Sequence, residues 1–185
     1  MADASEHVRS GPTRYVAVVG PGQPMPQPGA SDARATEPPA EALAAAEEVG
    51  AELARRGVCL ISGGLGGVME AACRGAAREG GQTVGLLPGR DRADGNAYLS
   101  VTLPTGLGEL RNALVVAASD AVIAVGGSWG TLSEIALAVR TGKPTIVLGP
   151  LSWQVGYPGD GYLVVNTPRE AVEQALSAIG AAQPG

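Results

Sequence analysis

Three short apolar segments of this chain each end abruptly in a glycine-rich turn. The segments are Tyr15–Val19, Val58–Ser62 and Ala121–Val125, and the turns that follow them are residues 20–22, 63–67 and 126–130. Continuous apolar runs of this length, rich in β-branched residues, are typical of parallel strands buried on both faces. Glycine directly after such a strand permits the tight backbone that leads into a helix. The repeated pattern favours an α/β fold.

Helical stretches separate these predicted strands. One runs from Glu41 to Arg56 and stops at Gly57, and a second is expected from Val68 to Glu79. The remaining expected helices cover residues 110–118, 131–140 and the segment after Pro168, and the remaining strands cover 83–87, 99–103, 145–148 and 162–165. The alternation predicts a Rossmann-like, doubly wound parallel sheet with helices on both faces. Ligands of such sheets bind outside the carboxyl ends of the strands.

The length of 185 residues fits a single domain. We expect a Rossmann-like nucleotide-binding domain over residues 14–180, preceded by a disordered tail at 1–13 and followed by a loose tail at 181–185. Residues 23–37 are rich in Pro, Gln, Ala and Gly and are expected to form a long loop. The polar segment 89–98 is expected to form a flap over the site.

Charge and composition argue against several classes of function. The chain has 13 basic and 18 acidic residues, a net charge of −5 and no basic cluster, which argues against a nucleic-acid partner. It has no apolar stretch long enough to span a bilayer and no apolar targeting segment, so a cytoplasmic protein without a membrane partner is expected. Cys59 and Cys73 lack metal-ligand spacing, so we expect free thiols in a reducing compartment and no metal site.

The segment from Gly126 to Glu134 carries the strongest functional signal. A strand, a glycine turn and a helix start follow one another here, and the free N–H groups and dipole of a helix N-terminus favour phosphate. Thr131 and Glu134 also match a capping box, which would explain both residues without a ligand. That alternative does not explain Gly126 and Gly127, so the whole segment favours a ligand site.

Familiar nucleotide motifs are missing. No Gly-Lys-Ser/Thr follows any of the turns, which argues against a Walker A loop, and the first turn lacks the dinucleotide fingerprint. A monophosphate or a compact phosphate ester is therefore expected. Arg111 is the one charge in the apolar stretch 110–118, so it is either a solvated charge or part of the site. Lys143 is the only lysine and occupies an ordinary turn, which argues against pyridoxal phosphate chemistry.

These motifs together resemble the LOG (Lonely Guy, or "lysine decarboxylase-like") family of Rossmann-type proteins. The resemblance runs from about Tyr15 to Val165 and is carried by residues 63–71, by the pair Arg111-Asn112 and by residues 126–134. Within that family the chain is most similar to the branch that contains the molybdenum cofactor carrier protein.

The resemblance implies a hydrolase that cleaves the N-glycosidic bond of a nucleoside 5′-monophosphate, with Arg111 and Glu134 as its catalytic pair. Two departures favour the alternative of a non-catalytic carrier of the molybdenum cofactor, or another nucleotide-binding protein. Asn112 replaces the usual lysine, and Val125 with the Ser128-Trp129 spacer replaces the compact Pro-Gly-Gly form. The residues expected to bind the phosphate or nucleotide are Gly20, Gly22, Gly63, Gly64, Gly66, Gly67, Met69, Asn112, Gly126, Gly127, Ser128, Trp129, Gly130 and Thr131.

No cofactor is expected to be required, and the bound small molecule is expected to be an AMP-like nucleotide or the molybdenum cofactor. The helices expected at 110–118 and 131–141 are apolar on more than one face. Such helices are typical of burial against a partner, so a homo-oligomer, a dimer or a tetramer, is also expected.

Overall fold

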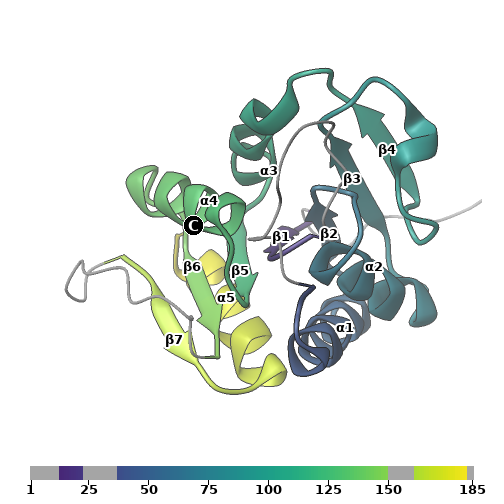
Figure 1. The fold of residues 1–185 in the computed structure, drawn as a ribbon. Helices are drawn as coiled ribbons and strands as arrows, with labels where there is room; N and C mark the ends of the chain where they lie inside the picture. Colours follow the sequence, from purple (N-terminus) through teal and green to yellow (C-terminus); the bar gives the residue numbers. More distant parts are fainter. Residues whose placement is uncertain (1–12, 23–36, 150–160, 183–185) are drawn as a thin grey trace, which may run out of the picture.

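The computed structural model describes residues 13–22, 37–149 and 161–182. Its strands are β1 (Tyr15–Val19), β2 (Cys59–Ser62), β3 (Thr83–Leu87), β4 (Val101–Pro104), β5 (Ala121–Val125), β6 (Thr145–Leu148) and β7 (Leu163–Val165). They form one sheet in the order β4-β3-β2-β1-β5-β6-β7, and every neighbouring pair is parallel (Figure 1). The predicted fold class, an α/β parallel sheet, is confirmed.

The helices are α1 (Ala40–Arg55), α2 (Val68–Arg78), α3 (Asn112–Ala117), α4 (Trp129–Arg140) and α5 (Pro168–Ala182), with short 3₁₀ turns η1 (Arg92–Asp94) and η2 (Gly108–Arg111). The helix expected over 110–118 therefore divides into η2 and α3, as 3₁₀ turns often begin a helix. Helix α5 continues into the first two residues of the expected tail at 181–185. The rest of that tail, residues 1–12 of the N-terminal tail and most of the loop expected at 23–37 lie outside the described residues.

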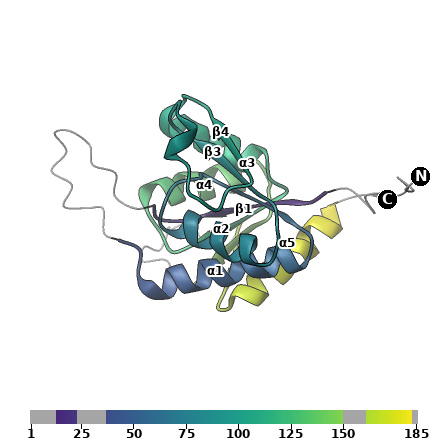
Figure 2. The same cartoon turned by 90° about the vertical axis from the view of Figure 1, so that its right-hand side faces the viewer.

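Helices cover both faces of the sheet. Alternate strand residues such as Val16 and Val18 pack into a core with α1, α2 and α5, while Ala17 and Val19 face a second core with α3 and α4. Figure 2 shows α1, α2 and α5 together on one side of the strands. This double covering explains why the strands are apolar throughout, since side chains on both faces are removed from water.

Helices α1 and α2 pack with their backbones in close approach at two glycines. A Cβ at Gly50 would collide with the carbonyl oxygen of Ala72, and one at Gly75 would collide with the carbonyl oxygen of Glu47. Gly50, a poor helix former by propensity, is therefore required by packing.

The glycine turns lie at one place in the sheet. Strands β2, β1 and β5 are neighbours. After β1 the chain adds β2, β3 and β4 on one side of it, and it then returns to add β5, β6 and β7 on the other side. A reversal of this kind leaves a crevice at the carboxyl ends of the strands, where ligands bind in open α/β sheets. The fold therefore brings the three turns to the same edge.

Candidate functional site

The first and second glycine turns are in direct contact. The backbone N–H of Val68, the first residue of α2, donates to the carbonyl of Pro21 at 3.0 Å. The methyl group of Met69 lies against Gly22, and the ring of Pro21 lies against Gly126 of the third turn. The structure thus places these turns side by side, as the sequence predicts.

The side chain of Asn96 is hydrogen-bonded to the glycine turn after β2. Its side-chain amide donates to the carbonyls of Gly64 and Leu65 at 3.2 and 3.1 Å. This residue belongs to the segment that we expected to form a flap, and the hydrogen bonds tie that segment to the turn. The sequence offered no signal for this role, because the two segments are brought together only by the pairing of β3 with β2.

Ser128 caps the N-terminus of α4. Its hydroxyl accepts a hydrogen bond from the N–H of Thr131 at 3.3 Å and lies 2.9 Å from the Thr131 hydroxyl. The alternative of a capping box between Thr131 and Glu134 therefore does not apply, because the helix begins at Trp129 and Thr131 is already inside it. The N–H groups of Trp129 and Gly130 donate to no other described residue, so the end of the helix can accept an anion.

Arg111 lies buried at the end of η2, with only 5% of its surface exposed. Its guanidinium lies against the backbone of Gly63, where a Cβ would overlap Nη1 and Cζ. Neither Nε nor Nη1 has a hydrogen-bond partner among the described residues. Burial lowers the pKa of Arg111, and the charge of Glu134 opposes that shift. A buried guanidinium without partners is costly, so this group fits an anionic ligand.

Glu134 is also buried, with 6% of its surface exposed, in the second turn of α4. Burial raises the pKa of Glu134 to about 7, although Arg111 lowers it and Glu109 adds to the rise. In the described part of the chain, the side-chain carboxyl of Glu134 forms no hydrogen bond with Arg111 or with another residue. The structure thus brings the two predicted catalytic residues close enough for their charges to interact. With a pKa of about 7, the Glu134 carboxyl gains or loses its proton near neutral pH.

Asn112 and Trp129 were also expected to bind the ligand, but Asn112 contacts α4 and Trp129 is exposed. The amide of Asn112 donates to the hydroxyl of Ser133 at 3.1 Å, and Ser133 donates to the carbonyl of Gly130 at 2.7 Å. Asn112 therefore joins α3 to the first turn of α4. The side chain of Trp129 is 83% exposed, and it borders a groove on the outer side of α3 and α4.

Lys143 contacts the end of α3, and both cysteines are buried. Nζ of Lys143 donates to the carbonyls of Ala117 and Ser119 at the end of α3, before β6 and therefore at the edge opposite the glycine turns. Cys59 and Cys73 are buried free thiols. Within the described ranges, no group of three or more His, Cys, Asp or Glu side chains is arranged to hold a metal ion, and no helix is long and apolar enough to cross a membrane.

A family model for the SLOG cluster4 family matches residues 13–175. The chain belongs to this family. The match covers every described strand and the three glycine turns, so it includes the site. A relative from Archaeoglobus fulgidus, named only as an uncharacterised protein, is 42% identical over 132 residues, which are 71% of this chain and 83% of the relative.

Two solved structures have the same fold over almost all of the described chain. The molybdenum cofactor binding protein of Rippkaea orientalis is 31% identical, covers 92% of this chain and 99% of its own, and has a TM-score of 0.79. The molybdenum cofactor carrier protein of Chlamydomonas reinhardtii is 28% identical with the same coverage and a TM-score of 0.75. The chain thus belongs to the SLOG cluster4 family, and its fold is similar to that of molybdenum cofactor binding and carrier proteins. Membership of the LOG family, inferred from the glycine motifs, is not shown.

Proposed function

We propose that this SLOG cluster4 protein binds a small molecule with a phosphate monoester, of the pterin-cofactor class, at the carboxyl edge of the sheet. Arg111 carries the proposal, because Nε and Nη1 of its buried guanidinium have no hydrogen-bond partner among the described residues. Its charge acts on Glu134 of α4, the helix whose N-terminus can accept an anion. Both features favour the same chemical group, a phosphate. The named ligand of the two similar structures, the molybdenum cofactor, supports the pterin class.

The residues present fit such a ligand in two respects. Arg111 and the free N–H groups of Trp129 and Gly130 would hold the phosphate. Glu134, with its pKa near 7, can be neutral at physiological pH and would then not repel the anion. When bound, the cofactor would bring its own metal chemistry, and the protein would supply binding, orientation and protection from water.

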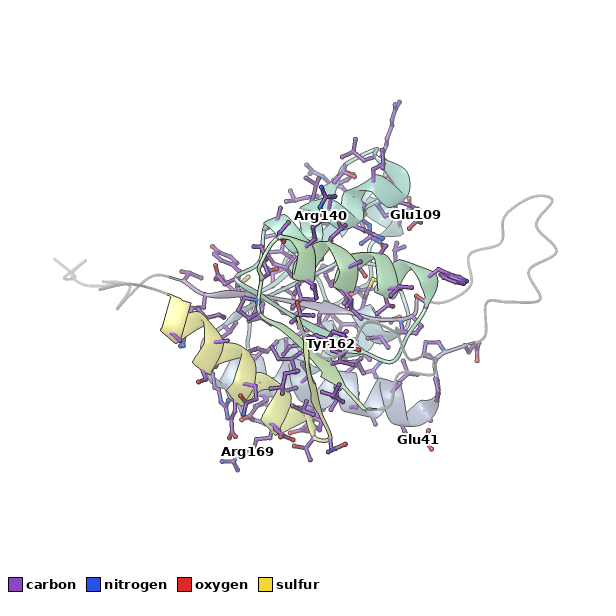
Figure 3. The ribbon with its side chains drawn as sticks, turned by 90° about the vertical axis from the view of Figure 1, so that its left-hand side faces the viewer. Glu41, Glu109, Arg140, Tyr162 and Arg169 are labelled. Carbon is purple, nitrogen blue, oxygen red and sulfur yellow. The ribbon has the colours of Figure 1, made fainter. Side chains whose placement is uncertain are left out.

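The deciding experiment is mass spectrometry of small molecules released from the purified native protein. A pterin phosphate is the expected result, and Arg111→Met should abolish its co-purification. Arg169→Met is the matched control, because Arg169 lies on the exposed surface of α5 (Figure 3) and should leave the yield of ligand unchanged. A protein that retains no phosphate ester, and is not stabilised by any, would overturn the proposal.

A second candidate function is hydrolysis of the N-glycosidic bond of a nucleoside 5′-monophosphate. It is favoured by the proximity of Glu134 and Arg111, since Glu134 could stabilise positive charge on the ribose or orient water, while Arg111 holds the phosphate. Water would add to C1′ and the base would leave with a proton. Release of free adenine from AMP, abolished in Glu134→Gln, would establish this activity. If no free base is released from any purine or pyrimidine monophosphate, ligand carriage is the only function that remains proposed.

A further inference from the structure

A groove of about 480 Å³ lies between η2, α3 and α4. Its lining is mostly apolar and includes Leu110, Ala113 and Leu137, with the indole of Trp129 beside them. That indole is 83% exposed. Pockets for small organic molecules are typically concave and apolar, with a few polar groups that fix the orientation of the ligand. A flat, exposed indole gains most by stacking on another planar ring.

The groove begins at the helix end where the phosphate is proposed to bind. Trp129 and Gly130 line it, and the backbone N–H groups of the same two residues donate to no other described residue. Asn112 also lines the groove, and its hydrogen bond to Ser133 holds the start of α3 against the first turn of α4. A ligand whose phosphate is held at this helix end therefore has its other atoms within reach of the groove.

Glu109 gives the groove its only charge among the described residues that line it. The side chain is exposed, and Figure 3 shows it at the opposite end of the α3 and α4 pair from Arg140. Burial raises the pKa of Glu134, and the negative charge of Glu109 raises it further, so the two carboxyl groups lie within electrostatic range. An ionised carboxylate repels the anionic end of a ligand and accepts hydrogen bonds only from donors such as N–H groups.

We propose that the groove binds the ring system of the phosphate ligand, and that Glu109 selects a ring whose edge carries two neighbouring N–H donors. Guanine and pterins share such an edge, that of a 2-amino-4-oxopyrimidine. Its ring N–H and amino group point the same way, so one carboxylate accepts both, while Trp129 stacks on the ring face. Adenine instead sets a ring nitrogen lone pair beside its amino group, and that lone pair would face the carboxylate. The inference rests on the proposed function, because the bound phosphate places the ring.

The first test compares the affinities of four phosphate esters for the full chain by isothermal titration calorimetry. GMP and 6-hydroxymethylpterin phosphate should each bind at least tenfold more tightly than AMP, because a site that pairs with N–H donors rejects a ring that lacks one. The tighter of the two identifies the source of the edge. Ribose 5-phosphate, which has no ring system of this kind, measures the phosphate site alone.

The same titrations separate failure of the ring site from failure of the phosphate site. Equal affinities for GMP, AMP and ribose 5-phosphate would overturn the proposed ring site and leave the phosphate site standing. No binding of any of the four esters would contradict the proposed function as well.

Glu109→Gln tests the selection of the edge. A glutamine side chain presents one acceptor and one donor, which match the amino group and ring nitrogen of adenine. The ratio of GMP to AMP affinity should therefore fall at least tenfold. Loss of the negative charge acts on every phosphate ester alike, so the ratio is the decisive quantity. Glu48→Gln is the matched control, because Glu48 is exposed on α1, across the sheet from α3 and α4, and should leave the ratio unchanged. A ratio that Glu109→Gln does not alter would refute the role of Glu109.

Trp129→Ala tests the stacking. The change removes the indole but keeps the backbone N–H, so GMP should bind about tenfold more weakly while ribose 5-phosphate binds as before. Trp129→Phe retains a planar ring and should recover most of the GMP affinity. Circular dichroism checks that each variant folds. Full affinity of Trp129→Ala for GMP, or an equal loss for ribose 5-phosphate, would show that the indole does not hold the ring.

Discussion

The guanidinium of Arg111 lies against the backbone of Gly63, in space that any side chain at position 63 would fill. The glycine turn after β2 therefore leaves room for this buried cation, whose charge also acts on Glu134 of α4. In the proposed function, two turns that are 63 residues apart in the sequence, at Gly63 and Gly126, would act on one ligand.

Gly63→Ala should displace Arg111 and abolish binding of phosphate esters. The guanidinium is the movable partner, so the cost to the free energy of unfolding should be modest, about 1 kcal/mol. Thermal-shift titration with AMP as a probe measures the loss of binding, and urea unfolding measures the change in the free energy of unfolding. Gly180→Ala is the control, because nothing lies within 4 Å of a Cβ there. An alanine at 63 that binds as well as wild type would show that Arg111 does not hold the phosphate.

The stability of the protein should fall as the pH rises from 4.5 to about 7 because of Glu134. Its pKa is raised from 4.5 to about 7 by burial, so the folded state holds a proton that the unfolded state loses. The free energy of unfolding should fall by about 3 kcal/mol in all because of Glu134, and this loss should stay constant above pH 8. Glu134→Gln should remove this component of the pH profile in urea unfolding. Equal profiles for the two proteins would mean that Glu134 ionises normally.

Binding of a permanently doubly charged anion should weaken as the pH rises above 7. Sulfate is a suitable probe because its charge does not change in this range. Its negative charge near Glu134 favours the protonated carboxyl, so binding takes up a proton and the affinity falls by up to tenfold per pH unit. Glu134→Gln should bind sulfate with little dependence on pH. A sulfate affinity that rises with pH would contradict the proximity of this carboxyl to the anion.

Ser128→Ala should destabilise the protein by about 1 kcal/mol, the usual cost of a lost helix N-cap. Ser128→Asp should keep the cap and the stability, but its negative charge should reduce phosphate binding. Comparing urea unfolding with ligand titration in the two variants separates the structural role of Ser128 from its place in the site. Unchanged ligand affinity in Ser128→Asp would place the anion away from this helix end.

Gly50→Ala should destabilise the protein by more than about 2 kcal/mol, although alanine is the better helix former. The added methyl group would meet the backbone carbonyl of Ala72, which cannot move without separating α1 from α2. Thermal unfolding measures the effect. Gly180→Ala in α5 should instead raise the free energy of unfolding, because alanine favours the helix and its methyl group meets no other atom there.

Several features of the candidate site could be predicted from local sequence. Arg111 was recognisable as the one charge in an apolar stretch, and Glu134 by its place after a glycine turn. The cap at Ser128 was not, because Thr131 and Glu134 satisfy the same pattern and only the backbone decides where the helix begins. The role of Asn112 was also missed, since its contact with Ser133 depends on how α3 packs beside α4.

By itself, the sequence determined the strands, the parallel sheet and the edge at which the glycine turns gather. Hydrophobic periodicity and glycine act over a few residues, so these features are local. The tertiary structure alone decided that Arg111 lies buried over Gly63, with no described partner for Nε or Nη1, and that Glu134 is removed from water. It also decided that Leu110 and Trp129 remain exposed. Burial and electrostatic environment depend on segments distant in the chain, so no local pattern could specify them.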